Sequence, residues 1–135
     1  MKGLKYQLNE AAKTATVTGA EKKSISKVTI PATVKVNGKT YQVTAIQAAA
    51  FNQMTTLKTL TIGKNILSIG ASAFDSCTKL KTVKIQTRNL KLKQVGANAF
   101  RNNPKKAVYT CPDGLVKSYK KILTKRGASK QATYK

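Results

Sequence analysis

The sequence is poor in the residue types on which most enzyme active sites depend. It contains no histidine and no tryptophan, and only 4 of its 135 residues are acidic. General acid–base catalysis uses a histidine or a pair of carboxylates. The acidic residues lie far apart along the chain, at Glu10, Glu21, Asp75 and Asp113. We therefore expect no catalytic residues and a protein that is not an enzyme.

The same shortage excludes the usual metal and cofactor sites. A structural zinc ion takes about four cysteine or histidine ligands, and this chain has two cysteines in all. A calcium site needs a cluster of oxygen ligands, whereas the carboxylates here are isolated. No GxxxxGK[ST] or GxGxxG phosphate-binding run occurs. The prediction is no metal and no cofactor.

The two cysteines, Cys77 and Cys111, are too few for a disulfide framework and lie outside any CxxC spacing. Each occupies a position where a small apolar side chain would be buried, and free cysteine is among the residues most often found in cores. Two reduced thiols in the core are favoured over a disulfide. The redox compartment stays open.

Long apolar runs are also missing. No stretch approaches the 18 or more apolar residues of a membrane span, and residues 1–13 contain no apolar segment of a signal peptide. Two interpretations follow. The protein is cytosolic, or the chain is a piece of a longer exported protein whose targeting signal lies elsewhere.

What the chain has in excess is positive charge. Lysine and arginine number 26, which gives a formal net charge of +22 at pH 7. Such a charge attracts anions, so nucleic acid, anionic cell-wall polymers, acidic glycans and anionic membranes are candidate partners. Because the lysines are spread along the whole chain, they also suit a purely solvating role.

One pattern of residues occurs twice, in segments 44–64 and 67–86. The matched positions are separated by 23 residues: Ile46 and Ile69, Ala50 and Ala73, Phe51 and Phe74, Leu57 and Leu80, Leu60 and Val83, Ile62 and Ile85. A third copy places Phe100 at 26 residues after Phe74, with three extra residues in the loop at 87–89. A period of this length predicts a solenoid of stacked units.

Within each unit, the pattern Leu-x-x-Leu-x-Ile predicts a strand with alternate side chains directed outward. Stacked strands would bring these outward residues into one ribbon across a parallel sheet, the usual binding surface of a solenoid. The predicted ligand-binding face consists of Lys27, Thr29, Thr59, Thr61, Thr82 and Lys84. Threonine is also an ordinary strand former on a solvated face. The phenylalanines should stack in the core, with small residues beside them: Phe51, Phe74 and Phe100, with Ala50, Ala73 and Ala99.

These patterns predict a β-rich solenoid, a single leucine-rich-repeat domain of about three units over residues 1–135. Alternating apolar residues predict an N-terminal β-hairpin over 1–24 that covers the exposed edge of the first unit. The repeats occupy 25–111, and Asn37-Gly38 predicts a hairpin inserted at 34–43. A helical cap is expected over 112–135.

The expected helix carries one apolar stripe, formed by Leu115, Tyr119, Ile122 and Leu123. Asp113 is the predicted N-cap and Gly127 the residue that follows the helix end. The helix is expected to lie over the last unit as the C-terminal cap. The alternative is binding to a membrane surface through its lysine face, formed by Lys117, Lys120, Lys121 and Lys125. A short strand is possible at the sequence ATY near the end.

The repeat resembles the BspA-type (Treponema pallidum type) leucine-rich repeat, with its IGxxAFxxCxxLxxVxIP pattern. The resemblance covers about residues 25–125, and departs from the pattern at Gln47, Ala48 and Met54. The ends of the chain are similar to parts of lysine-rich surface proteins of Gram-positive gut bacteria. The resemblance implies an extracellular or cell-wall-associated protein, part of a longer exported chain, with a role in adhesion and protein contact.

Two functional hypotheses follow. The first is a monomeric surface module that binds a protein, a glycan or an anionic wall polymer through the solenoid face. The second is a charge-driven nucleic-acid or polyanion binder. Sequence-specific nucleic-acid readers use base-stacking aromatics or a recognition helix, and here the phenylalanines are assigned to the core. Nucleic acid is therefore expected to bind only non-specifically.

Overall fold

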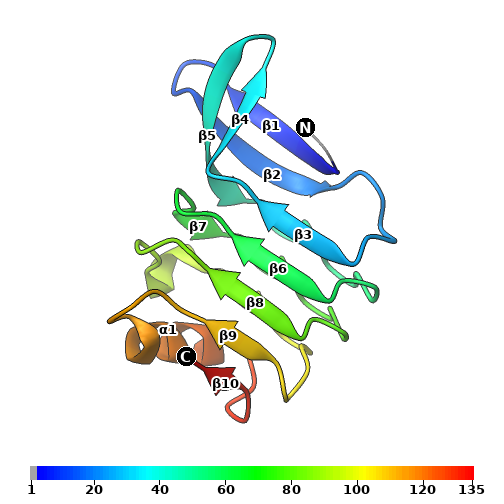
Figure 1. Ribbon diagram of the computed structural model, residues 1–135, viewed down its shortest axis with the longest axis vertical. Coiled ribbons are helices and arrows are strands. Elements are labelled where there is room, and N and C mark those ends of the chain that lie inside the picture. The colour runs from blue at the N-terminus through cyan, green and yellow to red at the C-terminus, as the bar shows by residue number, and fades with distance from the viewer. Residues whose placement is uncertain (1–2) are drawn as a thin grey trace.

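The computed structural model describes residues 3–135 and shows two β-sheets with one α-helix at the end of the stack (Figure 1). Sheet I has the order β1-β2-β5-β4, with β7 also paired to β5. Its strands are β1 (Leu4–Asn9), β2 (Thr14–Ala20), β4 (Thr33–Val36), β5 (Lys39–Ile46) and β7 (Ser68–Ile69).

Sheet II has the order β10-β9-β8-β6-β3. Its strands are β3 (Lys27–Ile30), β6 (Thr59–Ile62), β8 (Thr82–Ile85), β9 (Val108–Thr110) and β10 (Thr133–Tyr134). The helix α1 (Val116–Lys125) and the short 3₁₀ helix η1 (Leu92–Gln94) complete the described elements. All neighbouring strands of sheet II run parallel, as expected when each strand comes from a successive coil of chain.

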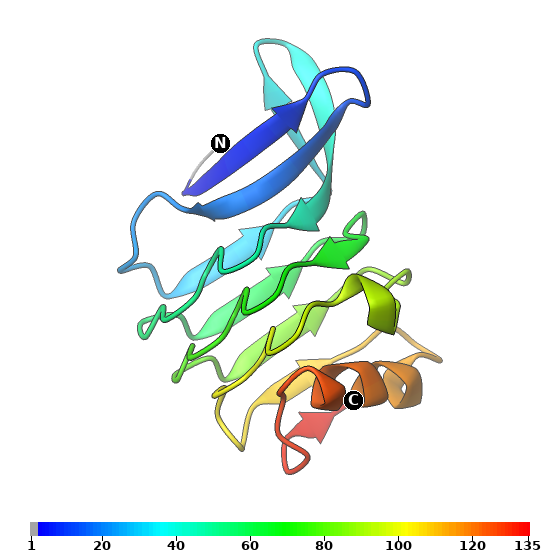
Figure 2. The same cartoon turned by 180° about the vertical axis from the view of Figure 1, so that it is seen from behind.

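The chain winds between the two sheets. Each coil passes through a strand of sheet II, crosses to sheet I, and returns through a turn that contains the Ala-Phe dipeptide (Figure 2). Ile46, Ile69 and Val95 lie opposite one another on the sheet I side, although the sequence pattern predicted strands only for the other side. The solenoid therefore has two stacked walls with the core between them.

The predicted repeat register is confirmed. Leu60 lies opposite Val83 on one side and Val28 on the other, and Val83 lies opposite Tyr109. The ATY segment forms β10, which extends the sheet beyond β9. The side chains of these paired residues point inward and are buried, because side chains alternate between the two faces of a strand.

The three repeat phenylalanines form the predicted ladder in the core. The rings of Phe51 and Phe74 are stacked with centroids 5.3 Å apart, and those of Phe74 and Phe100 are 5.5 Å apart. All three side chains are fully buried. The ring of Tyr109 meets Phe100 edge-on and then stacks on Tyr134, so one column of aromatic rings runs to the C-terminal end.

The turns that carry these rings are hydrogen-bonded from coil to coil. Phe51 N–H donates to Ala73 O and Phe74 N–H donates to Ala99 O, each at 2.8 Å. Each turn also holds two non-glycine residues at positive φ, in equivalent positions: Ala49 and Gln53, Ser72 and Ser76, Asn98 and Asn102. The left-handed region disfavours most L-residues, so the turn geometry is imposed by the stacking.

Close stacking also leaves no room for a side chain at two glycines of the turns. A Cβ at Gly70 would lie 2.2 Å from Ala48 N, and one at Gly96 would lie 2.3 Å from Ala71 N. In the coil that precedes that of Gly70, the same repeat position is Gln47, which is exposed. The absence of a side chain at Gly70 and Gly96 therefore lets these two turns lie directly against the backbone of the preceding coil.

The N-terminal hairpin forms as predicted, with Tyr6 opposite Val17 and Leu8 opposite Ala15. Its placement differs from the prediction. Strand β2 pairs parallel with β5 of sheet I, so the hairpin covers the edge of that sheet, whereas β3 is the end strand of sheet II. The reason is that Val17 lies opposite Ile46 and has the same position in its own coil. Strand β2 is therefore the sheet I strand of the first coil.

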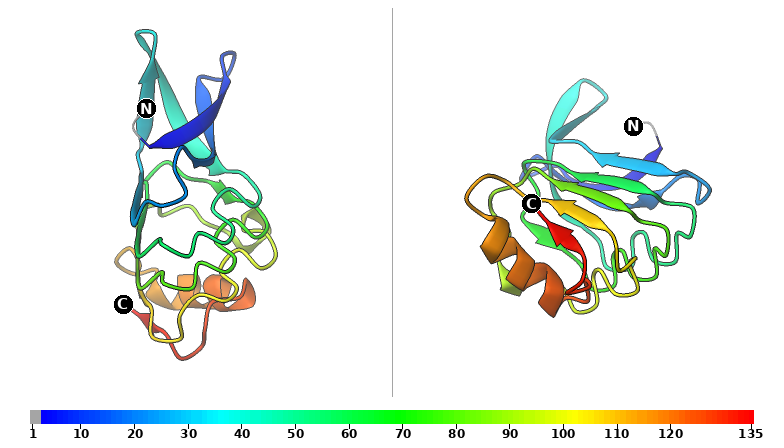
Figure 3. Two further views of the ribbon diagram at one scale, coloured as in Figure 1. Left: turned by 90° about the vertical axis from the view of Figure 1, so that its right-hand side faces the viewer. Right: turned by 60° about the horizontal axis from the view of Figure 1, so that its bottom comes forward.

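The hairpin predicted at residues 34–43 is present as β4 and β5, joined at Asn37 (φ 51°) and Gly38 (φ 79°). These angles are those of a type I′ turn. The hairpin is not a separate insertion, because β5 continues to Ile46 and pairs with β2 and β7. Both hairpins lie at the end of the molecule opposite α1 (Figure 3, left).

The C-terminal helix ends as predicted and begins differently. Gly127 has a φ of 105°, and Ala128 N–H donates to Leu123 O in a Schellman arrangement. The prediction of Asp113 as N-cap was wrong, because the N-cap is Leu115 and no side chain caps it. The buried hydroxyl of Tyr119 donates to Thr87 O at 2.7 Å and accepts from Leu90 N–H. The loop with three extra residues thus anchors the helix.

One ion pair bridges adjacent coils. Arg101 Nη2 lies 2.7 Å from Asp75 Oδ2, and Arg101 Nε donates to the same carboxylate. The Asp75 side chain is buried, whereas that of Arg101 is half exposed. The hydrogen bonds from Arg101 hold the pKa of Asp75 below the ordinary carboxyl value, against the opposing effect of burial.

We predict that Gly70→Ala destabilises the protein by about 2 kcal/mol or more, because the new methyl group would overlap the backbone of the neighbouring coil. Urea unfolding followed by circular dichroism measures the change. Gln47→Ala is the matched control at the same repeat position, where a Cβ is already present, and it should change stability by less than about 0.5 kcal/mol. Equal effects of the two substitutions would contradict the stacking assigned to Gly70.

The lowered pKa of Asp75 predicts acid sensitivity with a defined sign. Since the folded state binds this proton less readily than the unfolded state, the stabilisation is complete above the ordinary carboxyl pKa and is lost as pH falls through the lower folded value. The melting temperature of the wild type should therefore drop between about pH 4 and pH 2, and that of Asp75→Asn should drop less. Asp113→Asn, at an exposed position, is the control that should follow the wild type.

Candidate binding face

The six residues predicted from the sequence to form a binding face are brought together on the outer side of sheet II. Lys27, Thr59 and Thr82 lie opposite one another in one row across β3, β6 and β8. Thr29, Thr61 and Lys84 form the second row on the same strands. The strands that carry both rows face the viewer in Figure 1.

Side-chain exposure differs along these rows in a regular way. The threonines of the central strands, Thr59, Thr61 and Thr82, are half-buried, whereas Lys27, Thr29 and Lys84 are exposed. The buried partners between them, such as Leu60, hold each strand flat against the core. The result is a polar surface of half-buried threonines and exposed lysines, backed by the buried side of the sheet.

Sequence reasoning missed further residues of this face. Thr110 on β9 continues the second row, because it lies opposite Lys84. Lys58 and Lys81 are exposed beside the first row, and Lys81 N–H donates to Lys58 O. Their separation of 23 residues is the repeat period, so this lysine pair could have been found from the sequence.

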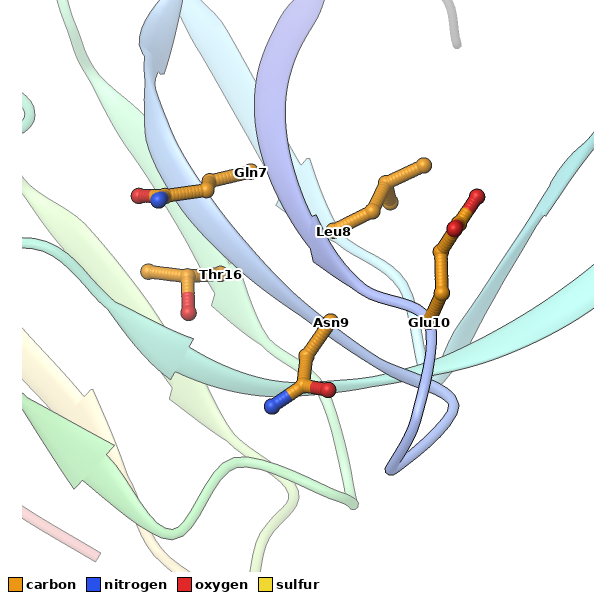
Figure 4. Close-up of a pocket in the computed structure, with 5 residues that line it drawn as sticks. All are labelled: Gln7, Leu8, Asn9, Glu10 and Thr16. Carbon is orange, nitrogen blue, oxygen red and sulfur yellow. The ribbon is translucent and has the colours of Figure 1, made fainter.

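A hollow of about 640 Å³ lies elsewhere, on the N-terminal hairpin (Figure 4). Its lining is Gln7, Leu8, Asn9, Glu10 and Thr16. Gln7 and Thr16 point to one side of the hairpin while Leu8 and Glu10 point to the other. Glu10 is the one acidic group in this lining, so the hollow does not combine the acid and base that hydrolytic chemistry uses.

The two thiols are reduced and buried, as predicted. Cys77 Sγ lies 3.1 Å from Phe51 O, and burial raises the pKa of this thiol to about 11. Burial also raises the pKa of Cys111. The thiolate is the form of cysteine that acts as a nucleophile or binds a metal ion. Because burial disfavours the thiolate, both cysteines are suited to core packing and not to nucleophilic attack or metal binding.

Residues 3–135 show neither a metal-binding cluster nor a membrane-spanning helix. Three or more histidine, cysteine, aspartate or glutamate side chains do not gather anywhere in this part of the chain in a way that could hold a metal ion. The described helices are also too short or too polar to cross a membrane.

Comparison with known proteins identifies the repeat. A family model described as a BspA type leucine rich repeat region matches residues 18–124 in six copies. The sequence pattern predicted about three units. No curated protein matches this chain.

Solved structures share the fold. A leucine rich cell surface protein from Faecalibacterium prausnitzii is 25% identical, with a TM-score of 0.65 over 84% of this chain. A leucine-rich repeat protein from Bacteroides ovatus is 24% identical, with a TM-score of 0.62 over 84% of this chain. A third, from Bacteroides capillosus, is 21% identical, with a TM-score of 0.68 over the whole chain.

The lengths of these proteins differ. This chain spans 36% of the Faecalibacterium protein, 35% of the Bacteroides ovatus protein and 96% of the Bacteroides capillosus protein. The family match covers most of the sequence, and the stacked coils have the register that the repeat requires. The chain therefore belongs to the BspA-type leucine-rich repeat family.

Proposed function

We propose that this protein is a non-enzymatic interaction module of the cell surface, which binds a protein, a glycan or an anionic cell-wall polymer through the outer face of sheet II. The observation that carries the proposal is the alignment of two polar rows across successive coils. Flat stacked strands with outward polar side chains are the surface that solenoid proteins use for binding. The residues that make contact are Lys27, Thr29, Thr59, Thr61, Thr82 and Lys84.

Charge supports an anionic or polar partner. Lys27 and Lys84 are the exposed lysines of the face, and the exposed Lys58 and Lys81 lie beside it. The whole molecule carries a net charge of +22, which favours encounter with negatively charged surfaces. Half-buried threonines supply hydroxyl donors and acceptors in fixed positions, which suits a partner with its own hydrogen-bonding groups.

The location follows from the family. A protein with the same fold from Faecalibacterium prausnitzii is a cell surface protein, and the present chain spans about a third of it. We propose that this chain is likewise extracellular or attached to the cell wall, as a monomeric single domain of a longer exported protein. Self-association is opposed by the high net charge of the same sign on each copy.

A second candidate is charge-driven binding of nucleic acid or another polyanion. It rests on the excess of lysine and arginine, 26 against 4 acidic residues. Binding by phosphate neutralisation alone falls steeply with salt concentration and depends little on which exposed lysine is involved. Binding through the face of sheet II would instead depend on particular residues.

The hairpin β1–β2 and the segment from residue 112 onward act as caps in this proposal. An uncapped solenoid exposes apolar core and strand edges at its ends. Tyr119 supports this role at the C-terminal end, since its ring is buried and its hydroxyl ties α1 to the loop at Thr87 and Leu90.

The variant Thr59→Glu/Thr82→Glu tests the face. It should weaken binding of polyglycerol phosphate or heparin about tenfold at physiological salt, because two carboxylates enter the centre of the face. Surface plasmon resonance measures the affinity, and the melting temperature should stay nearly constant. Gln42→Glu/Gln131→Glu adds the same charge at exposed positions elsewhere. Equal weakening by both double variants, for these polymers and for duplex DNA alike, would favour the charge-driven alternative.

Tyr119→Phe tests the C-terminal cap. It removes the partner of Thr87 O and of Leu90 N–H, and an unpaired buried polar group costs about 1–3 kcal/mol. We expect a single unfolding transition at lower temperature in calorimetry, because loss of a cap destabilises the whole stack. A separate early transition confined to the helix would show that α1 is not a cap. Tyr6→Phe, on a half-buried ring of the other end, is the comparison variant.

A further inference from the structure

The two sheets of the solenoid end differently at the N-terminal side. Sheet I continues past the first coil, because β1 pairs antiparallel with β2. Sheet II stops at β3, and no strand among residues 3–135 pairs with its outer side. In Figure 1, β3 is the uppermost strand of the sheet II stack. We propose that the outer edge of β3 binds an extended acidic segment of a partner protein, which adds to sheet II as a further strand.

The direction of the backbone hydrogen bonds defines which groups are available. Thr59 N–H donates to Ser26 O at 3.1 Å, and Lys27 lies opposite Thr59 in the parallel register. Peptide groups alternate between the two sides of a strand. Those of Val28 therefore face β6, and the N–H and C=O groups of Lys27 and Thr29 face the open edge.

Among the outer strands of the two sheets, β3 is the one best suited to pairing. Strand β10 has only two residues, and β1 contains a register shift between Lys5 and Tyr6, a feature that protects strand edges. Strand β4 belongs to the hairpin that projects from the stack (Figure 3). The ladder of β3 with β6 is regular over all four residues, so an added strand would meet a straight template.

A groove beside β3 gives an added strand a place for its side chains. It has a volume of about 330 Å³ and is lined by Gly3, Leu4, Ile25, Lys27, Val28 and Thr29. The apolar part of this lining, from Leu4 and Ile25, would receive the inward side chains. Alternate side chains of the same strand would point outward, beside Lys27.

Charge selects an acidic partner over a second copy of this chain. Lys22, Lys23 and Lys27 are exposed in β3 and the loop that leads to it, where Glu21 is the one carboxylate. Two copies joined through β3 and β10 would bring together molecules with a net charge of +22 each. An extended peptide with alternating acidic and apolar residues satisfies the backbone, the groove and the charge together.

This site uses backbone groups at the edge of the sheet, so it does not depend on the proposed role of the outer face. The two proposals fail separately. Glutamate at Thr59 and Thr82 tests the face, whereas proline at Thr29 tests the edge.

The experiment measures binding of a fluorescent peptide of alternating glutamate and valine by fluorescence anisotropy at physiological salt. Thr29→Pro removes the outward N–H, leaves the N–H groups that bond β6 in place, and is tolerated on an edge strand. It should lower affinity at least about tenfold with little change in melting temperature. Thr29→Val keeps the N–H and removes only the hydroxyl, which is the group of Thr29 that belongs to the outer face, so it should bind this peptide as the wild type does.

A second arm leaves the protein unchanged. The same peptide with every backbone nitrogen methylated keeps its charge and has no N–H donor on either edge, so it should bind at least about tenfold more weakly. Equal binding of the methylated and unmethylated peptides would overturn the proposal in favour of electrostatic attraction. Concentration-dependent sedimentation of the free protein that Thr29→Pro abolishes would overturn it in favour of a second copy.

Discussion

The distance at which successive coils stack governs the rest of this structure. Parallel strands lie about 4.8 Å apart, and every coil must meet its neighbours at that spacing on both walls and in the turns. This requirement explains why Gly70 and Gly96 have no room for a side chain. It also explains why alanine, glutamine and serine accept positive φ in the turns. The phenylalanine ladder fills the space that the stacked turns enclose.

The same constraint separates the roles of the residues. Positions directed inward are occupied by closely packed apolar side chains, so variation there is limited. Outward positions carry no such requirement, and in this chain they hold threonine and lysine. The regular order of the outer rows and strand edges follows from the packing of the core.

Much of this arrangement could be predicted from the repeat alone. The matched spacing of Phe51 and Phe74 implied both the register of sheet II and the aromatic ladder, because identical units stack in identical ways. The second wall was missed, since Ile46 and Ile69 stand in segments too short to show a strand period. The prediction did not find that the N-terminal hairpin covers the edge of sheet I. Only Val17 in the hairpin matches the repeat, at the position of Ile46, and a single matching residue does not show a repeat unit. The Asp113 cap failed because the Pro112–Gly114 turn delays the helix.

The three residues inserted at 87–89 have a consequence for how the array can grow. Thr87 is buried, accepts at its carbonyl from Tyr119, and donates through its hydroxyl to Ile66 O. The residues that hold α1 in place therefore belong to the loop at 87–89, one unit before the helix in the sequence. Duplication of the 23-residue unit upstream of this loop would lengthen the solenoid and keep the contact between Tyr119 and Thr87. An insertion between this loop and the helix would separate the two residues. Array length and array termination are thus encoded separately.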